Sequence, residues 1–310
     1  MIVCFDIGGS AVKSAVAFGA KDVRALARRP TPTGDFDDFV ATLREAIDEA
    51  VAQTGLRPER VAISIAGVVD PRSGKANVAN IPCLTGHRLA PEFSAALGVE
   101  VLVANDADCF ALAEAGVGAG RGHDVVFGAI IGTGVGGGLV ADGRLIGSGS
   151  GYAGEWGHGP VAKRMLTCLP EPLPLYQCGC GLKGCLDATC SARGIERLHR
   201  DINGAELPST EILALWHAGD AGAAKTVEAW LELISGPLAM VINMTGATVV
   251  AAGGGLSNDA GLMAALDAAT RPLTLANPSE PLVVQAECRT EPGLVGAAIL
   301  ALRDLPRNAA

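Results

Sequence analysis

The chain has 310 residues, of which 49% are hydrophobic and 18% are charged. These proportions predict an apolar core and exclude a disordered chain, and the length predicts two lobes. The formal net charge of −9 at pH 7 argues against a surface that binds nucleic acid or an anionic membrane.

No export signal or membrane span is predicted. Met1–Asp6 has no basic region leading into a long apolar stretch, and glycines and charges interrupt every apolar run before 18 residues. We therefore expect a cytoplasmic protein. Its nine cysteines are expected to be reduced thiols or metal ligands, not disulfides.

The first part of the chain predicts a β-meander followed by alternating helices and strands. Apolar runs predict strands at Ile2–Asp6, Val12–Phe18, Val23–Arg28, Val61–Ala66 and Val99–Ala104. Helices are predicted at Asp35–Thr54 and Leu89–Leu97, and from Asp106 through Glu114.

The opening pattern recurs after residue 124. Strands are predicted at Val125–Ile131, Gly136–Ala141, Arg144–Ile146, Thr248–Ala252 and Leu282–Ala286. An irregular segment rich in Cys and Gly covers about 148–190, and helices are predicted from there to about 245, at Leu262–Ala269 and at Leu294–Leu302. Because both parts begin with a strand, a glycine turn and a returning strand, we predict a duplicated α/β lobe with a cleft between the copies.

Three glycine-rich loops end apolar strands. Without Cβ atoms, successive N–H groups can approach phosphate oxygens closely. Ordinary hairpin turns would explain any one loop, but three at strand ends favour phosphate binding. The loop residues are Asp6, Gly8, Gly9 and Ser10; Gly132, Thr133, Gly134 and Gly136; and Gly253, Gly254 and Gly255.

Gly132, Gly134 and Gly137 also match the dinucleotide fingerprint G-x-G-x-x-G. That fingerprint requires a helix after the turn, whereas Asp142-Gly143 between two short apolar runs predicts a hairpin. We therefore reject a dinucleotide site. The P-loop pattern does not occur in the sequence.

Asp106 is a candidate catalytic base, because it follows a strand at the edge where α/β sheets bind ligands. An N-cap of the following helix is an equally good interpretation of its position. Asp6 follows the first strand in the same way and could organise Mg²⁺ directly or through water.

A candidate metal site consists of His158, Cys178, Cys180 and Cys185. Three thiolates and one imidazole are a tetrahedral structural zinc set. A redox pair or buried inert cysteines are the alternatives, although the spacing is not that of a C-x-x-C pair. Cys168 and Cys190 lie near enough in sequence to compete as ligands.

Together these motifs resemble the ROK family of sugar kinases and repressors, within the actin-like ATPase (ribonuclease H-like) superfamily. The resemblance extends over nearly the whole chain and is most specific where Gly154–His158 precedes Cys178–Cys185. Within the family, the stretches 105–114, 131–139 and 253–258 are most similar to bacterial N-acetylglucosamine kinases. The family fold implies a two-lobed protein with duplicated βββαβαβα lobes: residues 1–118 plus 291–310, and residues 119–290 with a zinc segment at 155–190.

The resemblance implies phosphorylation of a hexose by Mg-ATP, with N-acetylglucosamine the leading substrate and structural Zn²⁺ beside it. Asp106 would be the general base, and a homodimer is expected. The implied sugar-binding residues are Asn80, Asn105, Asp106, Glu155, His158 and Asp187.

Three departures from the family pattern affect substrate identity: Ala66 replaces a common proline, Ser10-Ala11 replaces Thr-Lys, and Asp187 replaces a glutamate. Kinases for N-acetylmannosamine, glucose or fructose remain alternatives. A repressor is less favoured because the first strand begins at Ile2, with no room before it for a helix-turn-helix. A sugar sensor without catalysis is less favoured because Asp106 stands at the catalytic position.

Overall fold

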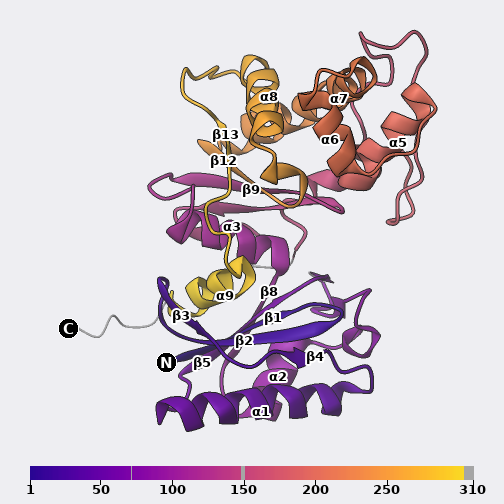
Figure 1. Cartoon of the computed structure of the whole chain (residues 1–310). Helices are drawn as coiled ribbons and strands as arrows, with labels where there is room; N and C mark the ends of the chain where they lie inside the picture. Colours follow the sequence, from indigo (N-terminus) through magenta and orange to yellow (C-terminus); the bar gives the residue numbers. More distant parts are fainter. Residues whose placement is uncertain (71, 148–150, 304–310) are drawn as a thin grey trace. The chain divides into compact units, whose positions relative to one another are not determined.

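The structure is a computed structural model that describes residues 1–70, 72–147 and 151–303 (Figure 1). The chain divides into two compact units. Unit 1 comprises Met1–Arg121, Gly138–Ala153 and Cys288–Ala310, and unit 2 comprises Gly122–Gly137 and Gly154–Glu287. Relative to the bounds proposed from the sequence, the main difference is that the segment 138–153 belongs with unit 1.

Unit 1 is built on a six-stranded sheet with the order β3-β2-β1-β5-β8, to which β4 adds by pairing with β2. β1 runs antiparallel to β2 and parallel to β5. The strands are β1 (Ile2–Ile7), β2 (Ala11–Gly19), β3 (Asp22–Ala25), β4 (Arg29–Pro30), β5 (Arg60–Ile65) and β8 (Val101–Asn105). A small separate hairpin, β6 (Val68–Val69) with β7 (Ala76–Asn77), was not predicted.

Helices cover both faces of this sheet. Because strand residues alternate in direction, Val3 and Phe5 pack with α1 and α2, whereas Ile2 and Cys4 pack with α3 and α9. A strand buried on both faces reads as a continuous apolar run, which is why β1 could be predicted. The helices are α1 (Phe36–Thr54), α2 (Leu89–Leu97), α3 (Asp106–Val117) and α9 (Pro292–Leu302).

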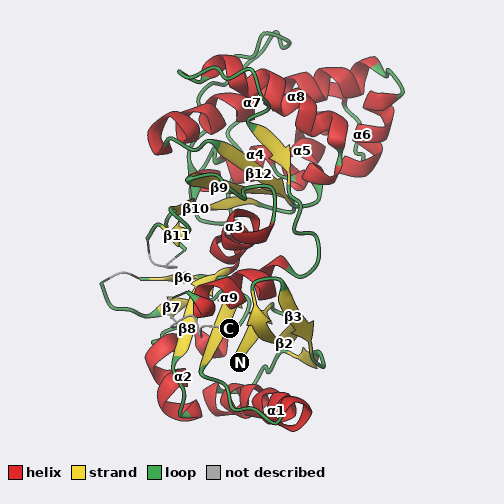
Figure 2. Cartoon of the chain, turned by 90° about the vertical axis from the view of Figure 1, so that its left-hand side faces the viewer, coloured by secondary structure: helices red, strands yellow, loops and turns green. Residues whose placement is uncertain are grey.

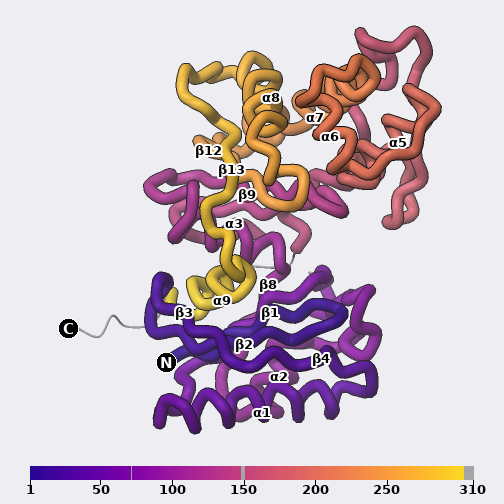
Figure 3. Tube along the Cα trace, in the orientation of Figure 1, coloured from indigo at the N-terminus to yellow at the C-terminus, as the bar shows by residue number. Residues whose placement is uncertain are grey.

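The last helix returns to the first strands (Figure 3). α9 contacts β1, β2, β5 and α3, and its Leu294 and Ala297 are buried. A Cβ added to Gly296 would lie 1.9 Å from the carbonyl oxygen of Cys109 in α3. The two helices therefore pack at a distance that only glycine permits at this position.

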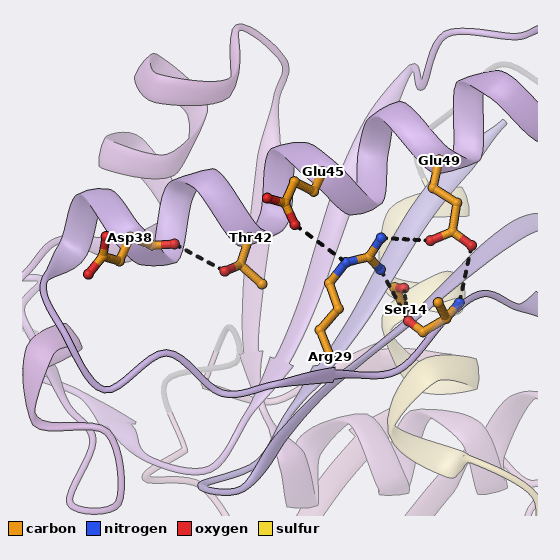
Figure 4. A network of polar contacts seen from close by, with 7 residues as sticks. Ser14, Arg29, Asp38, Thr42, Glu45 and Glu49 are labelled. Carbon is orange, nitrogen blue, oxygen red and sulfur yellow. Dashed lines mark hydrogen bonds and ion pairs between the residues drawn. The ribbon is translucent and has the colours of Figure 1, made fainter.

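Ion pairs fasten β4 to α1 (Figure 4). Arg29 Nη2 lies 2.7 Å from Glu49 Oε2, and its Nε lies 3.9 Å from Glu45 Oε2. Ser14 Oγ and Arg29 Nη1 both donate to the carbonyl of Ala27. These contacts hold the β2–β4 edge, and β2 begins directly after the first glycine loop.

The second sheet repeats the order of the first, β11-β10-β9-β12-β13, which confirms the duplication. The boundary between the units falls within β10, after Gly137. The strands are β9 (Val125–Ile131), β10 (Val135–Ala141), β11 (Arg144–Leu145), β12 (Val249–Gly253) and β13 (Val283–Gln285).

The helices of unit 2, red in Figure 2, lie beside the strands of this sheet. They are α4 (Leu186–Cys190), α5 (Ala192–Asn203), α6 (Ser209–His217), α7 (Ala221–Thr245) and α8 (Ala260–Thr270). Short 3₁₀ turns complete the two units: η1 (Pro82–Leu84), η2 (Trp156–His158), η3 (Leu256–Asn258) and η4 (Arg271–Leu273).

By length and composition alone, α7 could cross a membrane. Of its most apolar stretch, 56% is buried inside the protein. Trp230 in α7 is fully buried, and its Nε1 donates to the carbonyl of Cys190. Such burial is typical of the core helix of a globular domain.

Candidate active site

The first glycine loop of unit 1 is a tight turn fixed by Thr31. Gly8 N–H donates to the carbonyl of Ala11 at 3.0 Å. Thr31 donates from Oγ1 to the carbonyl of Gly8 at 2.6 Å and from its N–H to the carbonyl of Ser10 at 3.3 Å. The β2–β4 edge thus holds the turn that the sequence predicted as a phosphate loop.

This turn lines a cavity of about 300 Å³ in unit 1. Asp6 Oδ1 accepts a hydrogen bond of 2.9 Å from Ser64 Oγ. Lys13 Nζ lies 3.6 Å from Asp6 Oδ2 and 2.6 Å from Glu291 Oε2. The cavity is lined by Asp6, Ile7, Gly8, Gly9, Ser10, Ala11, Lys13, Arg28, Ala66 and Asp106.

Sequence reasoning missed Lys13 and Arg28. Lys13 lies opposite Asp6 in the β1–β2 register, so pairing the two predicted strands in register would have placed it at the cavity. Arg28 was included at the end of the predicted third strand, which ends at Ala25 in the structure. The two cations balance the charge of the two aspartates that line the cavity.

The structure shows which residue caps the helix α3 that begins at Asp106. Asn105 is the N-cap of α3, because its side chain accepts from the N–H groups of Ala107 and Asp108. Asp106 is the first residue of the helix, and its carboxylate lines the cavity. Although the residue is exposed at the cavity, the protein atoms packed around the carboxyl raise its pKa, and the charge of Asp6 raises it further. The N–H of Ala107 partly opposes these two effects.

Two predicted sugar-binding asparagines also lie in unit 1. Asn105 Nδ2 donates to the carbonyl of Gly67 at 2.7 Å. Asn80 is exposed next to the glycine turn, since a Cβ on Gly9 would lie 3.1 Å from Asn80 Cβ.

The other two glycine loops meet in unit 2. Gly132 N–H donates to the carbonyl of Gly134 at 2.9 Å. Gly254 has φ +93°, and a Cβ there would lie 2.6 Å from the carbonyl carbon of Ile131. A Cβ on Gly132 would lie 3.3 Å from the amide nitrogen of Gly255. The residues Gly132, Thr133 and Gly134 therefore adjoin Gly253, Gly254 and Gly255. β10, which pairs with β11, follows the turn, so the hairpin predicted at Asp142-Gly143 is confirmed.

The predicted metal ligands form one group in unit 2. One ligand atom from each of His158, Cys178, Cys180 and Cys185 lies within 4.8 Å of all the others. Cys178 Sγ is 3.7 Å from His158 Nδ1, and the Sγ atoms of Cys180 and Cys185 are 3.7 Å apart. Thiolates at about 2.3 Å from a tetrahedral zinc stand about 3.8 Å apart, so the geometry fits zinc. Among the described residues this group includes neither Cys168 nor Cys190.

Glu155 and Asp187 lie next to the metal ligands. Glu155 Oε2 is 3.5 Å from His158 Nε2, so a carboxylate faces the ring nitrogen opposite to the one near Cys178, as in many zinc sites. Asp187 Oδ1 accepts from the N–H of Val135 at 2.8 Å, and Oδ2 is 3.6 Å from Cys178 Sγ.

The chain is similar to known proteins over nearly its whole length. The sequence model of the ROK family matches residues 2–304. An N-acetylgalactosamine kinase of Shewanella sp. is 36% identical over 295 residues, 95% of this chain and 94% of that protein. An N-acetyl-D-glucosamine kinase of Histophilus somni is 36% identical over 299 residues, 96% of this chain and 98% of that protein.

A solved structure shows the same likeness in three dimensions. It is a ROK hexokinase from Thermus thermophilus, with a TM-score of 0.82 and 31% identity, and the match covers 98% of this chain and 99% of that one. This likeness confirms the expected two-lobed actin-like ATPase fold.

Proposed function

This chain belongs to the ROK family, and on that basis we propose that it phosphorylates an N-acetylhexosamine with Mg-ATP. N-acetylglucosamine is the leading substrate, and the 6-hydroxyl is the acceptor by analogy with the family. One observation carries the proposal: the Asp106 carboxylate lies in the same cavity as the glycine turn and Asp6.

In the proposed reaction, Asp106 accepts the proton of the attacking sugar hydroxyl. Its raised pKa suits this role, because a base with a higher pKa is a better proton acceptor once it is ionised. The phosphoryl group then passes to the sugar oxygen in line with the leaving ADP oxygen.

The glycine turns would supply backbone N–H donors to the phosphates, at Gly9 and Ser10 in unit 1 and at Thr133, Gly134 and Gly136 in unit 2. The N–H groups of Gly8 and Gly132 instead close their own turns, so these two residues would contribute by their lack of a side chain. The loop at Gly253, Gly254 and Gly255 would hold the adenosine. Mg²⁺ would neutralise charge on the transferred group, and Asp6 would hold it directly or through water. Lys13 adds a cation on the same cavity wall.

The sugar would be held by Asn80, Asn105, Glu155 and His158. His158 would also ligate structural zinc with Cys178, Cys180 and Cys185, a proposal supported by the ligand spacing. Thiolate ligands survive in a reducing compartment, which supports the expectation of a cytoplasmic enzyme.

A second substrate has an observation in its favour. The Shewanella relative is named as an N-acetylgalactosamine kinase, and the two sugars differ only in the orientation of one hydroxyl. We therefore include N-acetylgalactosamine among the candidates, together with N-acetylmannosamine, glucose and fructose.

A coupled assay of ADP release across these five sugars tests the proposal. We expect the highest kcat/KM with N-acetylglucosamine, and Asp106→Asn should lower kcat by about 10²–10⁴-fold while sugar affinity changes little. ADP release with none of the sugars would refute the kinase. Near-normal kcat in Asp106→Asn would refute the role of this residue as the base.

A further inference from the structure

The segment that carries the metal ligands also holds the second glycine turn in place. Three hydrogen bonds join the turn to this segment and to α5, which follows it. Ala192 N–H donates to the carbonyl of Gly132 at 2.7 Å, and Trp156 Nε1 donates to the carbonyl of Gly136 at 2.7 Å. The third is the 2.8 Å bond from the N–H of Val135 to Asp187 Oδ1. We call Trp156, Asp187 and Ala192 the turn clamp.

The contact between the turn clamp and the turn leaves no space for a side chain at two glycines. A Cβ on Gly134 would lie 2.7 Å from Asp187 Oδ1. A Cβ on Gly157 would lie 1.8 Å from the carbonyl oxygen of Val135. Trp156 further packs edge-on against Phe127 in β9, with ring centroids 6.0 Å apart. Glycine is therefore required on both sides of this contact, at Gly134 in the turn and at Gly157 in the segment.

The clamp is built from the elements that supply the metal ligands. Trp156 and His158 both lie in the 3₁₀ turn η2. Asp187 lies in the first turn of α4, the helix that Cys185 precedes as its N-cap residue. Asp187 Oδ2 is 3.6 Å from Cys178 Sγ. Cys178 and Cys185 pack in one cluster with Ala188 and Tyr176. A metal on these ligands would therefore fasten η2 and α4 together, and with them two of the three clamp bonds.

One oxygen of Asp187 is thus committed to the protein. Oδ1 accepts a backbone N–H, and Oδ2 lies 3.6 Å from Cys178 Sγ, which would be a thiolate and no donor once zinc is bound. Charge-assisted hydrogen bonds of this kind are stronger than neutral ones and fix geometry. The N–H that Asp187 engages is in the turn that the proposed function assigns to the phosphates of ATP.

We propose that Asp187 is a positioning residue for the nucleotide, which transmits the order of the metal segment to the turn at Gly132–Gly136. The sequence had suggested a sugar contact for this residue. The proposal rests on the proposed function, because it assumes that the turn binds the phosphates.

Affinity measurements on the zinc-loaded protein test this assignment without turnover. Asp187→Ala removes the acceptor, whereas Asp187→Asn keeps an amide oxygen at the same place. We expect the Kd of a non-hydrolysable ATP analogue to rise about tenfold in Asp187→Ala and to remain near wild type in Asp187→Asn. The Kd for N-acetylglucosamine and the zinc content per chain should be unchanged in both variants.

Asp220→Ala is the matched control. Asp220 also accepts one backbone N–H in unit 2, that of Ala223 at 2.8 Å, as the N-cap of α7. This variant should leave the affinity for the ATP analogue unchanged. An equal loss in Asp187→Ala and Asp220→Ala would overturn the proposal, because general destabilisation would then explain both.

Two other outcomes would also overturn it. A weaker sugar affinity with unchanged nucleotide affinity would make Asp187 a sugar ligand. Loss of zinc from Asp187→Ala would make it a part of the metal site. A wild-type protein that binds no ATP analogue would refute the proposed function itself, and with it the role of the turn.

Discussion

At the scale of single residues, Asp106 shows what the sequence could and could not predict. Its position after a strand suggested either a base or a helix cap, and the local sequence favoured neither. The backbone geometry of α3 assigns the cap to Asn105, which accepts its two N–H bonds, and the role of Asp106 as the base stays a prediction. Which of two adjacent polar residues caps a helix depends on the φ and ψ angles of each, and the sequence does not specify these.

The raised pKa of Asp106 has a consequence for pH dependence. The base works only as a carboxylate, so kcat/KM should fall as the pH drops through the pKa of the free enzyme. Because the pKa is raised, the acid limb should lie at a higher pH than an ordinary aspartate gives. A kcat/KM profile measured with N-acetylglucosamine from acidic to neutral pH checks this.

The raised pKa of Asp106 also predicts how its ionisation affects the stability of the fold. A carboxyl whose pKa is raised by folding favours the folded state when protonated, and this contribution is lost as the pH rises through the folded pKa. Asp106→Asn, which stays neutral, should therefore be at least as stable as wild type at neutral pH. A large loss of unfolding free energy in urea would contradict this account of Asp106.

At the scale of elements, most strands and helices could be predicted, since buried strands are continuous apolar runs and α1 has helical periodicity. The strands β4, β6 and β7 could not, because two residues each give no periodicity. The equally short β11 could, since the Asp142-Gly143 turn precedes it. The Cys-rich segment is irregular as expected apart from η2 and α4, and the four candidate metal ligands lie together as predicted. Its bonds to the turn at Gly132–Gly136 were missed, because they join residues far apart in the chain.

The candidate metal site leads to a prediction about zinc content and about the segment 155–190. Cys180→Ser removes one thiolate, and since structural zinc sites need all four ligands, we expect zinc to be released. The segment from 155 to 190 should then be cleaved faster by proteases. Elemental analysis and limited proteolysis measure the two effects.

Cys83→Ser is a suitable control for this experiment. Cys83 is a partly buried thiol of unit 1, outside the metal group, so its replacement should leave the zinc content unchanged. Carefully purified wild-type protein without zinc would count against the site.

At the scale of the whole molecule, the duplication was predictable, since both sheets begin with the same strand–turn–strand pattern. The boundary within β10 was not, because Gly137 and Gly138 continue one strand and no change of composition marks the division. Unit 1 takes its residues from three separate stretches of the chain and unit 2 from two. Neither unit is therefore a contiguous piece of sequence.

This interleaving predicts the effect of a truncation. A chain ending at Glu287 lacks α9, whose Leu294, Ala297 and Ala301 are buried on unit 1. Exposing this face should leave unit 1 without a complete core, so the truncated protein should aggregate or lose its near-ultraviolet circular dichroism. Native-like thermal unfolding of the truncated chain would contradict this.

A single substitution should weaken the packing of α9 on unit 1 without removing the helix. Gly296→Ala places a methyl group against the backbone of α3, and overpacking of this kind typically costs about 1–3 kcal/mol. It should lower the melting temperature without preventing folding.

The return of α9 to β1 also constrains how the protein is made. A ribosome adds roughly 5–20 residues per second, so the first strand emerges roughly 15–60 s before the helix that covers it. During most of that interval, α3 is the one helix of the final cover that is available to the face with Ile2 and Cys4. A nascent chain of this kind is a natural client for chaperones that shield apolar surfaces during synthesis, and slow translation of the last third would lengthen its exposure.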